Sequence, residues 1–266
     1  MKRTVLAASE FSVALLAGPA GCASGDSDAA DEPTPKASRA KEPGPARRPA
    51  TQMITAADLG QGYSVRDFSV AKEKSAFAET PDRITVDRGP CHPLATVMNQ
   101  LPLGRPQAFL TRVVSPEKSV GTPAEETTGT PAEETTGAAT EESTAVTYVT
   151  LAAYDRGMAT AAMDTLLARG VDSCRLGFTA RAVNGTTRTY PSVAVEEAGT
   201  AGDEALAYKA ATTVDGVTRT VRTTVVRSGD VIAVYVAVDG TARVDGEPRG
   251  PRVPAVVLTA QNAKLG

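Results

Sequence analysis

Residues 205–238 read ALAYKAATTVDGVTRTVRTTVVRSGDVIAVYVAV, and this stretch decides the fold. It consists of three runs rich in Val, Thr and Ala, which are separated by Asp215-Gly216 and by Ser228-Gly229-Asp230. Runs of this kind between short glycine turns are typical of consecutive antiparallel hairpins. The stretch therefore predicts a β-meander, with one strand in each run.

The middle run indicates that one face of this sheet is covered. Val221, Thr223 and Val225 alternate with Arg222 and Thr224. Because successive side chains of a strand point to opposite faces, the first three residues share a face that suits a core. We expect helices to pack against that face.

The meander extends upstream, where Asn184-Gly185 is a hairpin signal between residues 178–183 and residues 186–195. Alternating or apolar runs predict further strands at residues 63–70, 108–114 and 145–154. The predicted fold class is α+β, with an antiparallel sheet and helices packed on one face.

Three helices are expected around this sheet. The first follows Cys91 and has Pro93 at its start, followed by apolar residues at three- and four-residue spacing. The second is capped by Asp155 and closed by Gly170. Its predicted inward residues are Met158, Ala161, Ala162, Thr165 and Leu166. The last is a C-terminal amphipathic helix whose predicted apolar residues are Val253, Val256, Val257 and Ala260.

The N-terminus has the pattern of an export signal over residues 1–21, with Lys2 and Arg3 before an apolar run. Pro19-Ala20-Gly21-Cys22 resembles the small-residue site that precedes the lipidated cysteine of bacterial lipoproteins. The mature chain would then start at Cys22, carrying a lipid such as palmitate, on the outer face of the cell membrane. Pro19 and the charged Glu10 depart from the usual pattern. An ordinary secretory signal, with Cys22 as a free thiol, is the alternative.

The cysteine count supports export. The chain has three cysteines, so one is left over in an oxidising compartment unless Cys22 is lipidated. Cys91 and Cys174 then form the predicted disulfide. In the chain-entropy model, closing a loop of that length removes about 4 to 5 kcal/mol of denatured-state entropy. No Cys-x-x-Cys or Cys/His cluster predicts a metal site, and no cofactor is expected.

Two segments are too polar to join a core. Residues 22–50 are mainly Ala, Pro, Ser, Gly and charged residues, which predicts a disordered tether. Residues 121–144 hold three copies of an eight-residue repeat, with six Glu and no Lys or Arg, which predicts a disordered acidic insertion. The insertion joins the strands at 108–114 and 145–154, which we expect to pair as neighbours. The domain is assigned to residues 51–266.

The charge balance gives no reason to expect nucleic-acid binding. The chain has 28 Lys and Arg against 31 Asp and Glu, a formal net charge of −3. Because the repeat alone carries six negative charges, the rest of the chain is close to neutral or slightly basic. The partners expected are the membrane, through the lipid anchor, and an unknown small molecule, envelope polymer or protein.

Short motifs carry a resemblance to a known family. They are Thr55-Ala-Ala-Asp-Leu59, Cys91-His92-Pro93-Leu94, Ala201-Gly-Asp-Glu-Ala205 and Val226-Arg-Ser-Gly-Asp-Val231. Over residues 51–264 the chain resembles the extracytoplasmic lipoproteins of actinobacteria that are related to the sensor domain of the mycobacterial kinase PknH. The resemblance implies a tethered sensing or ligand-binding domain without catalysis. The kinase sensor has two disulfides, whereas this domain can form only one.

Candidate catalytic groups are few, and we predict that the protein is not an enzyme. His92 is the only histidine, and no Gly-x-Ser-x-Gly or His-Glu-x-x-His motif accompanies it. It is interpreted as a helix-start residue that caps backbone. The pairs Asp203-Glu204 and Glu196-Glu197 are interpreted as turn charges, because neighbours on a strand point to opposite faces.

Three classes of function remain. The favoured hypothesis is a sensing or ligand-binding module, with a groove between the sheet and the helices near Cys91 and Cys174. An envelope scaffold that presents protein-interaction surfaces is the alternative, and a secreted hydrolase is the third. Nothing in the sequence identifies the ligand or the residues that bind it.

Overall fold

The computed structural model describes residues 48–69, 77–117, 145–169, 171–214, 216–238, 242–244 and 247–266. The predicted signal, the lipidation site Cys22, almost all of the tether and the acidic repeat lie outside the described residues. The last three tether residues are an exception, because helix α1 (Arg48–Gln52) already includes them. Pro49 is suited to a helix start and is buried there, so the folded part begins slightly earlier than predicted.

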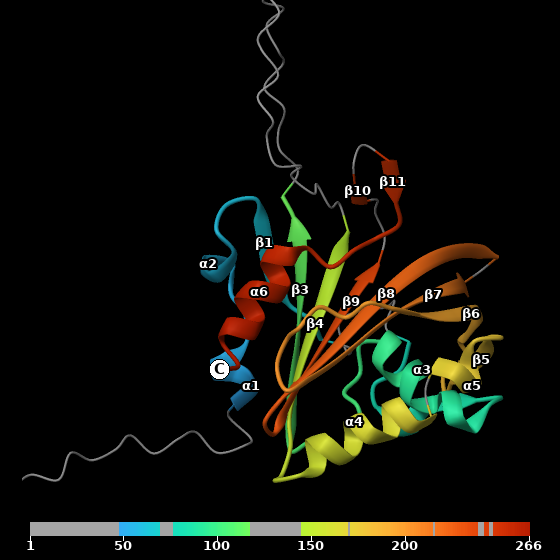
Figure 1. Ribbon diagram of the computed structural model, residues 1–266. Helices are drawn as coiled ribbons and strands as arrows, with labels where there is room; N and C mark the ends of the chain where they lie inside the picture. Colours follow the sequence, from blue (N-terminus) through green and yellow to red (C-terminus); the bar gives the residue numbers. More distant parts are fainter. Residues whose placement is uncertain are drawn as a thin grey trace, which may run out of the picture. The chain divides into compact units, whose positions relative to one another are not determined.

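A nine-stranded antiparallel sheet forms the centre of the molecule (Figure 1). Its strand order is β1-β3-β4-β9-β8-β7-β6-β5-β2. The strands are β1 (Tyr63–Asp67), β2 (Ile84–Val86), β3 (Ala108–Pro116), β4 (Val146–Ala153), β5 (Phe178–Ala182), β6 (Thr187–Glu196), β7 (Glu204–Val214), β8 (Val217–Ser228) and β9 (Val231–Val238). A separate two-stranded ribbon consists of β10 (Ala242–Val244) and β11 (Glu247–Arg249).

The predicted meander is confirmed, because β5 to β9 pair in sequence order. The prediction that the strands on either side of the acidic repeat are neighbours is also confirmed. β3 pairs with β4 in a register that places Leu110 opposite Leu151. β2 was not predicted from the sequence, because a three-residue strand is too short to show a period.

Two groups of helices cover opposite faces of the sheet. On β9 the two faces separate cleanly: Ile232 and Val234 join one apolar cluster, and Ala233 and Tyr235 join the other. The first face is covered by α3 (His92–Met98), α4 (Met158–Arg169) and α5 (Val171–Cys174), preceded by the 3-10 turns η2 (Pro81–Arg83) and η3 (Gly89–Cys91). The second is covered by α1, α2 (Ala56–Leu59) and α6 (Ala255–Ala263).

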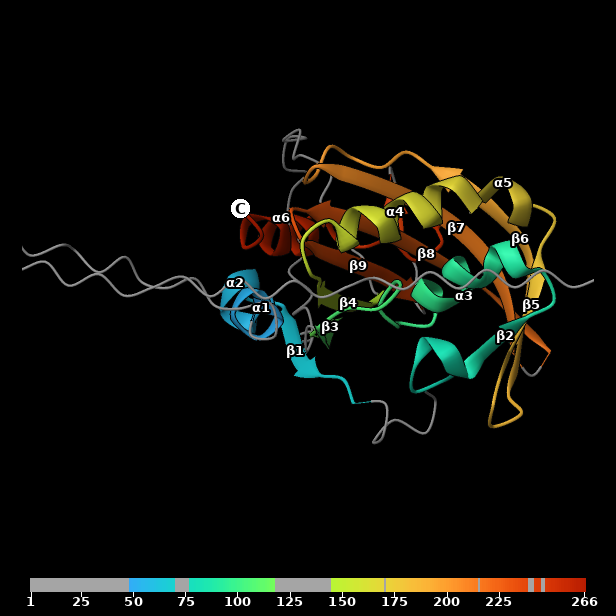
Figure 2. The same ribbon diagram turned by 90° about the horizontal axis from the view of Figure 1, so that it is seen from below.

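The α+β class is therefore as predicted, and the structure adds a smaller helical layer on the second face. Figures 1 and 2 show α3, α4 and α5 together, and α1, α2 and α6 in a separate group near β1. Among the helices in the described ranges, none combines the length and hydropathy of a membrane span.

The larger core is fastened by the Cys91–Cys174 disulfide. Its S–S distance is 2.06 Å and its Cα–Cα distance is 5.8 Å, and both cysteines are fully buried. The bond joins the residue before α3 to the last residue of α5 across a sequence separation of 83. The structure thus contains the pairing that the cysteine count predicts.

The predicted inward face of α4 is correct only in part, because Leu166 is buried and Ala162 packs against the core, but Met158, Ala161 and Thr165 are exposed. Ala159, Met163 and Leu166 are buried, whereas Met158 is 50% exposed. Only Leu166 belongs to both sets. The helix does not start at a side-chain cap, because Asp155 accepts the Met158 N–H through its backbone oxygen and binds the Gln107 side chain through its carboxylate.

The predicted face of α6 is correct only in part. Val257 is fully buried, but Val256 is 37% exposed. The second fully buried residue of this helix is polar, Gln261. A buried polar side chain requires partners, which the sequence pattern does not reveal.

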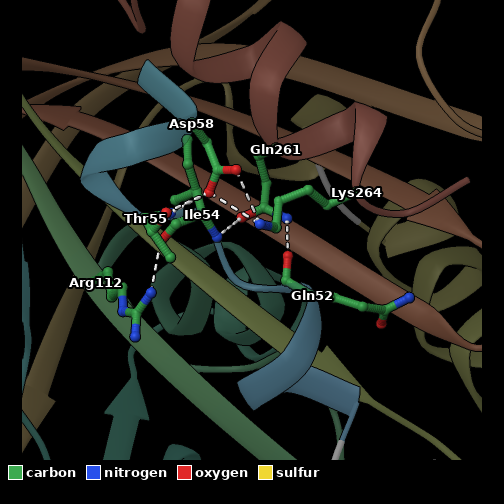
Figure 3. Close-up of polar contacts among 7 residues, drawn as sticks. All are labelled: Gln52, Ile54, Thr55, Asp58, Arg112, Gln261 and Lys264. Carbon is green, nitrogen blue, oxygen red and sulfur yellow. Dashed lines mark hydrogen bonds and ion pairs between the residues drawn. The ribbon is translucent and has the colours of Figure 1, made fainter. Parts of the chain in front are cut away.

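The partners of Gln261 form a polar cluster that we call the terminal clasp, drawn in Figure 3. It consists of Gln52, Ile54, Thr55, Asp58, Arg112, Gln261 and Lys264. Gln261 Oε1 accepts the Ile54 N–H at 2.8 Å, and its Nε2 donates to the Gln52 carbonyl at 2.9 Å. The clasp therefore binds the start of the folded chain to its last helix.

Candidate functional site

A pocket of about 900 Å³ lies beside the helices of the first face. It is bordered by the 3-10 turn η2, the start of α3, the 102–107 loop, the first residues of β3 and one side of α4. Its lining residues are Thr80, Pro81, Asp82, His92, Pro93, Thr96, Pro102, Leu103, Gly104, Arg105, Pro106, Gln107, Ala108, Phe109, Ala162 and Thr165. The volume falls within the usual range of small-molecule sites.

The 102–107 loop forms a fixed wall of this pocket. The Tyr154 hydroxyl donates to the Leu103 carbonyl at 2.5 Å. At the other end of the loop, the Gln107 backbone N–H donates to Ala153, and its side chain donates to Asp155 at 2.6 Å. Burial raises the pKa of Tyr154 well above its usual range, so this phenol stays a donor at every physiological pH.

His92 lines the pocket but has no catalytic partner in this geometry. Its Nε2 lies 3.1 Å from the Ile84 carbonyl of β2. Because a carbonyl can only accept, Nε2 carries the hydrogen of this bond. His92 is the first residue of α3, as predicted, but it binds a neighbouring strand rather than capping its own helix.

Two opposite charges are present on the lining. Asp82 accepts from the Thr80 side chain, which is the main reason that its pKa is lowered, and Arg83 and Arg105 contribute through charge. Arg105 contributes the positive charge of the lining, and Asp82 contributes the negative charge. The side chains of the pocket thus carry nearly no net charge.

Asp203 and Glu204 lie in a structural ion-pair cluster away from the pocket. Arg227 binds Asp203 Oδ2 at 2.9 Å through Nη1 and Glu204 Oε2 at 3.3 Å through Nε. Asp203 also accepts the Gly229 N–H, which holds the β8–β9 turn, as expected of a turn charge. The expectation that the two carboxylates point apart is wrong, because both bind Arg227. Asp203 precedes β7, so the alternation of side chains along that strand does not apply to it.

In the Glu196-Glu197 pair, only Glu196 has a structural role. Glu196 receives two hydrogen bonds from Arg222 Nε, at 2.8 and 3.0 Å. Arg222 Nη1 donates in addition to the carbonyls of Gly250 and Pro251. Glu197 is exposed. Neither carboxylate lines the pocket, and no group of His, Cys, Asp and Glu among the described residues could hold a metal ion.

The predicted groove near the two cysteines corresponds only in part to this pocket. His92 and Pro93, directly after Cys91, line it, but no residue of α5 does. The sequence interpretation did not single out Arg105, Gln107 or Phe109. The one available signal was the proline-bracketed stretch from Pro102 to Pro106, which is typical of a rigid loop.

Structural neighbours of this chain include two of low sequence identity. No family model matches the chain, and no curated protein matches it. The extracellular domain of PknH from Mycobacterium tuberculosis has a TM-score of 0.44 and 9% identity, covering 82% of this chain and 93% of that one. An uncharacterised Mycobacterium smegmatis protein, the Rv0999 ortholog, has a TM-score of 0.35 and 11% identity, covering 77% and 90%. The first neighbour is the domain whose likeness the sequence motifs indicated.

Proposed function

We propose that the chain is an exported cell-envelope lipoprotein, anchored through Cys22, whose folded domain binds a ligand without transforming it. The single observation that supports binding most directly is the pocket of about 900 Å³ with a braced loop as its wall. A pocket that is formed before the ligand arrives loses little conformational entropy on binding.

Export is supported by the disulfide. Cys91 and Cys174 are both fully buried and are paired with each other. Disulfides of this structural kind persist in oxidising compartments. The positively charged N-terminus and the small residues before Cys22 agree with that location.

Binding is favoured over catalysis because His92 and most of the carboxylates that could act in catalysis are held in structural contacts. His92 is the titratable ring of the pocket, and its Nε2 is used in binding Ile84. The carboxylate pairs noted in the sequence lie elsewhere, and Arg227 and Arg222 bind three of their four members. A hydrolase requires a positioned nucleophile beside a base. Among the described residues that line the pocket there is no serine or cysteine, and the Thr96 and Thr165 hydroxyls donate to backbone carbonyls.

The binding proposal is tested by filling the pocket. Ala162 lines it from α4, whereas the neighbouring Ala161 is exposed and does not. Full-length wild type, Ala162→Phe and Ala161→Phe are compared in a thermal-shift screen against envelope lipids, glycans and cell extract. Compounds that stabilise wild type and Ala161→Phe but not Ala162→Phe support the proposal. If no compound separates the two variants, the pocket is not the functional site and the scaffold alternative gains.

The anchoring proposal is tested by Cys22→Ser. Removing the thiol removes the acceptor of the lipid, so the protein should pass from the membrane fraction to the medium. Wild type expressed in parallel is the reference. Unchanged membrane retention would contradict lipid anchoring.

A further inference from the structure

The pocket combines an exposed aromatic ring with rigid apolar surfaces. Phe109 is 43% exposed and lines the pocket from the start of β3. Four prolines also line it: Pro81, Pro93, Pro102 and Pro106. An exposed aromatic ring can stack against the apolar face of a ligand. The same prolines have no N–H, so the pocket backbone lacks donors at these positions.

The polar side chains of the lining are mainly acceptors. The Thr96 hydroxyl donates to the His92 carbonyl at 2.9 Å, and the Thr165 hydroxyl donates to the Ala161 carbonyl at 2.8 Å. Each hydroxyl hydrogen is thus used within the protein, and each oxygen keeps acceptor capacity. A complementary ligand therefore brings several hydrogen-bond donors.

The charges of the lining argue against an ionic ligand. Asp82 and Arg105 both line the pocket and are close enough for Arg105 to lower the pKa of Asp82. An anionic ligand would meet the Asp82 carboxylate, and a cationic ligand would meet the Arg105 guanidinium. A neutral ligand avoids both conflicts and can hydrogen-bond to both groups.

We propose that this pocket binds a neutral polyhydroxylated ligand, a segment of a glycan, with one sugar ring stacked on Phe109. A sugar ring has an apolar C–H face and an edge of hydroxyl donors, which matches the platform and the acceptors described above. This inference rests on the proposed binding function and names its ligand class. Phe109 is the residue that determines selectivity for a ring.

The test compares matched oligosaccharides of different charge with the purified full-length protein. Chitohexaose is neutral, its deacetylated form is cationic, and oligogalacturonate is anionic. Calorimetry should detect binding of the neutral oligomer at millimolar concentration, with both charged oligomers about tenfold weaker or more. Phe109→Ala should weaken neutral binding by about tenfold, as for a buried aromatic contact. Leu176→Ala is the control, because Leu176 is 84% exposed and lies outside the pocket lining.

A soluble glycan and a glycolipid headgroup share this chemistry, and a second arm separates them. Phosphatidylcholine vesicles with and without a neutral glycosyl diacylglycerol are tested for sedimentation with the protein. Binding to the glycolipid vesicles, but not to free oligosaccharide, identifies the headgroup as the source.

The class assignment is wrong if neutral glycans fail in both arms or if Phe109→Ala binds as well as Leu176→Ala. If another class of compound stabilises Ala161→Phe but not Ala162→Phe in the thermal-shift screen, the proposed binding function is supported and only the glycan assignment is rejected. Circular dichroism and melting of Phe109→Ala establish that it is folded before the comparison.

Discussion

Gln261 is the residue on which the second helical layer depends most. It is completely buried, and both ends of its amide are used: Oε1 by the Ile54 N–H and Nε2 by the Gln52 carbonyl. Replacing it removes both bonds and leaves two backbone groups, from residues more than 200 positions away in the sequence, without these partners. Its sequence neighbours Val257 and Leu258 suggest only an apolar helix, so this role cannot be predicted from the pattern.

Gln261→Ala should therefore destabilise the protein by about 2 to 4 kcal/mol, because the buried Ile54 N–H and the half-buried Gln52 carbonyl lose this partner. Urea unfolding of the full-length protein measures the change. Thr259→Ala, an exposed position on the same helix, is the control and should differ little from wild type. A loss equal to that of the control would mean that water satisfies the two backbone groups.

Asp58 gives the terminal clasp a dependence on pH. Hydrogen bonds from Thr55, then from Lys264, lower its pKa to about 2. Its carboxylate lies 2.9 Å from Lys264 Nζ. Because the unfolded chain takes up this proton at a higher pH than the folded chain does, the stabilisation is present above about pH 4 and is lost as the pH falls to about 2.

Asp58→Asn should flatten the fall in unfolding free energy between about pH 4 and pH 2. Asp172→Asn is the matched control, because the Asp172 side chain is 95% exposed. The measurement is urea unfolding at a series of pH values. A wild-type slope in the Asp58→Asn variant would show that the clasp carboxylate does not carry the dependence.

At the scale of elements, strands with a clear period were predictable and helix orientation was not. The meander follows from Asn184-Gly185, Asp215-Gly216 and the β-branched runs between them, because turn and strand preferences agree there. In α4 the small residues Ala159, Ala161 and Ala162 are almost equivalent in hydrophobicity. The observed inner face is the one on which Ala159, Met163 and Leu166 join the larger core, and only tertiary packing selects it.

The pocket was less predictable than the fold for a related reason. Arg105, Gln107 and Phe109 come from one loop and one strand, but Ala162 comes from a helix more than fifty residues later. Only tertiary packing brings these segments together. His92 was identified because it is the single histidine, yet its role depends on the Ile84 carbonyl of a strand that the sequence did not predict.

Two methionines on α4 test its observed orientation. Met163 is completely buried, whereas Met158 is 50% exposed. Met163→Ala should cost about 2 to 5 kcal/mol through lost burial and a cavity, and Met158→Ala should cost less than about 1 kcal/mol. Thermal and urea unfolding of the two variants measure the difference. A larger loss for Met158→Ala than for Met163→Ala would support the face that the sequence pattern predicts, and equal losses would contradict the observed orientation.

At the scale of the molecule, the two faces of the sheet carry different features. The first face carries the disulfide and the helices that line the pocket, and the second carries the terminal clasp. The described chain begins at α1 on the second face.

The last prediction concerns the acidic repeat, residues 121–144. Its flanking strands pair directly, with Val114 opposite Thr147, so a short turn can replace the repeat without changing the ladder. Removing six like charges also removes repulsion within the segment. Replacement by a four-residue Gly/Asn turn should therefore change the unfolding free energy by less than about 1 kcal/mol, with a slight gain from the shorter loop. A loss of several kcal/mol would mean that the repeat packs against the domain. Scrambling the repeat at constant composition would then distinguish specific packing from a need for loop length.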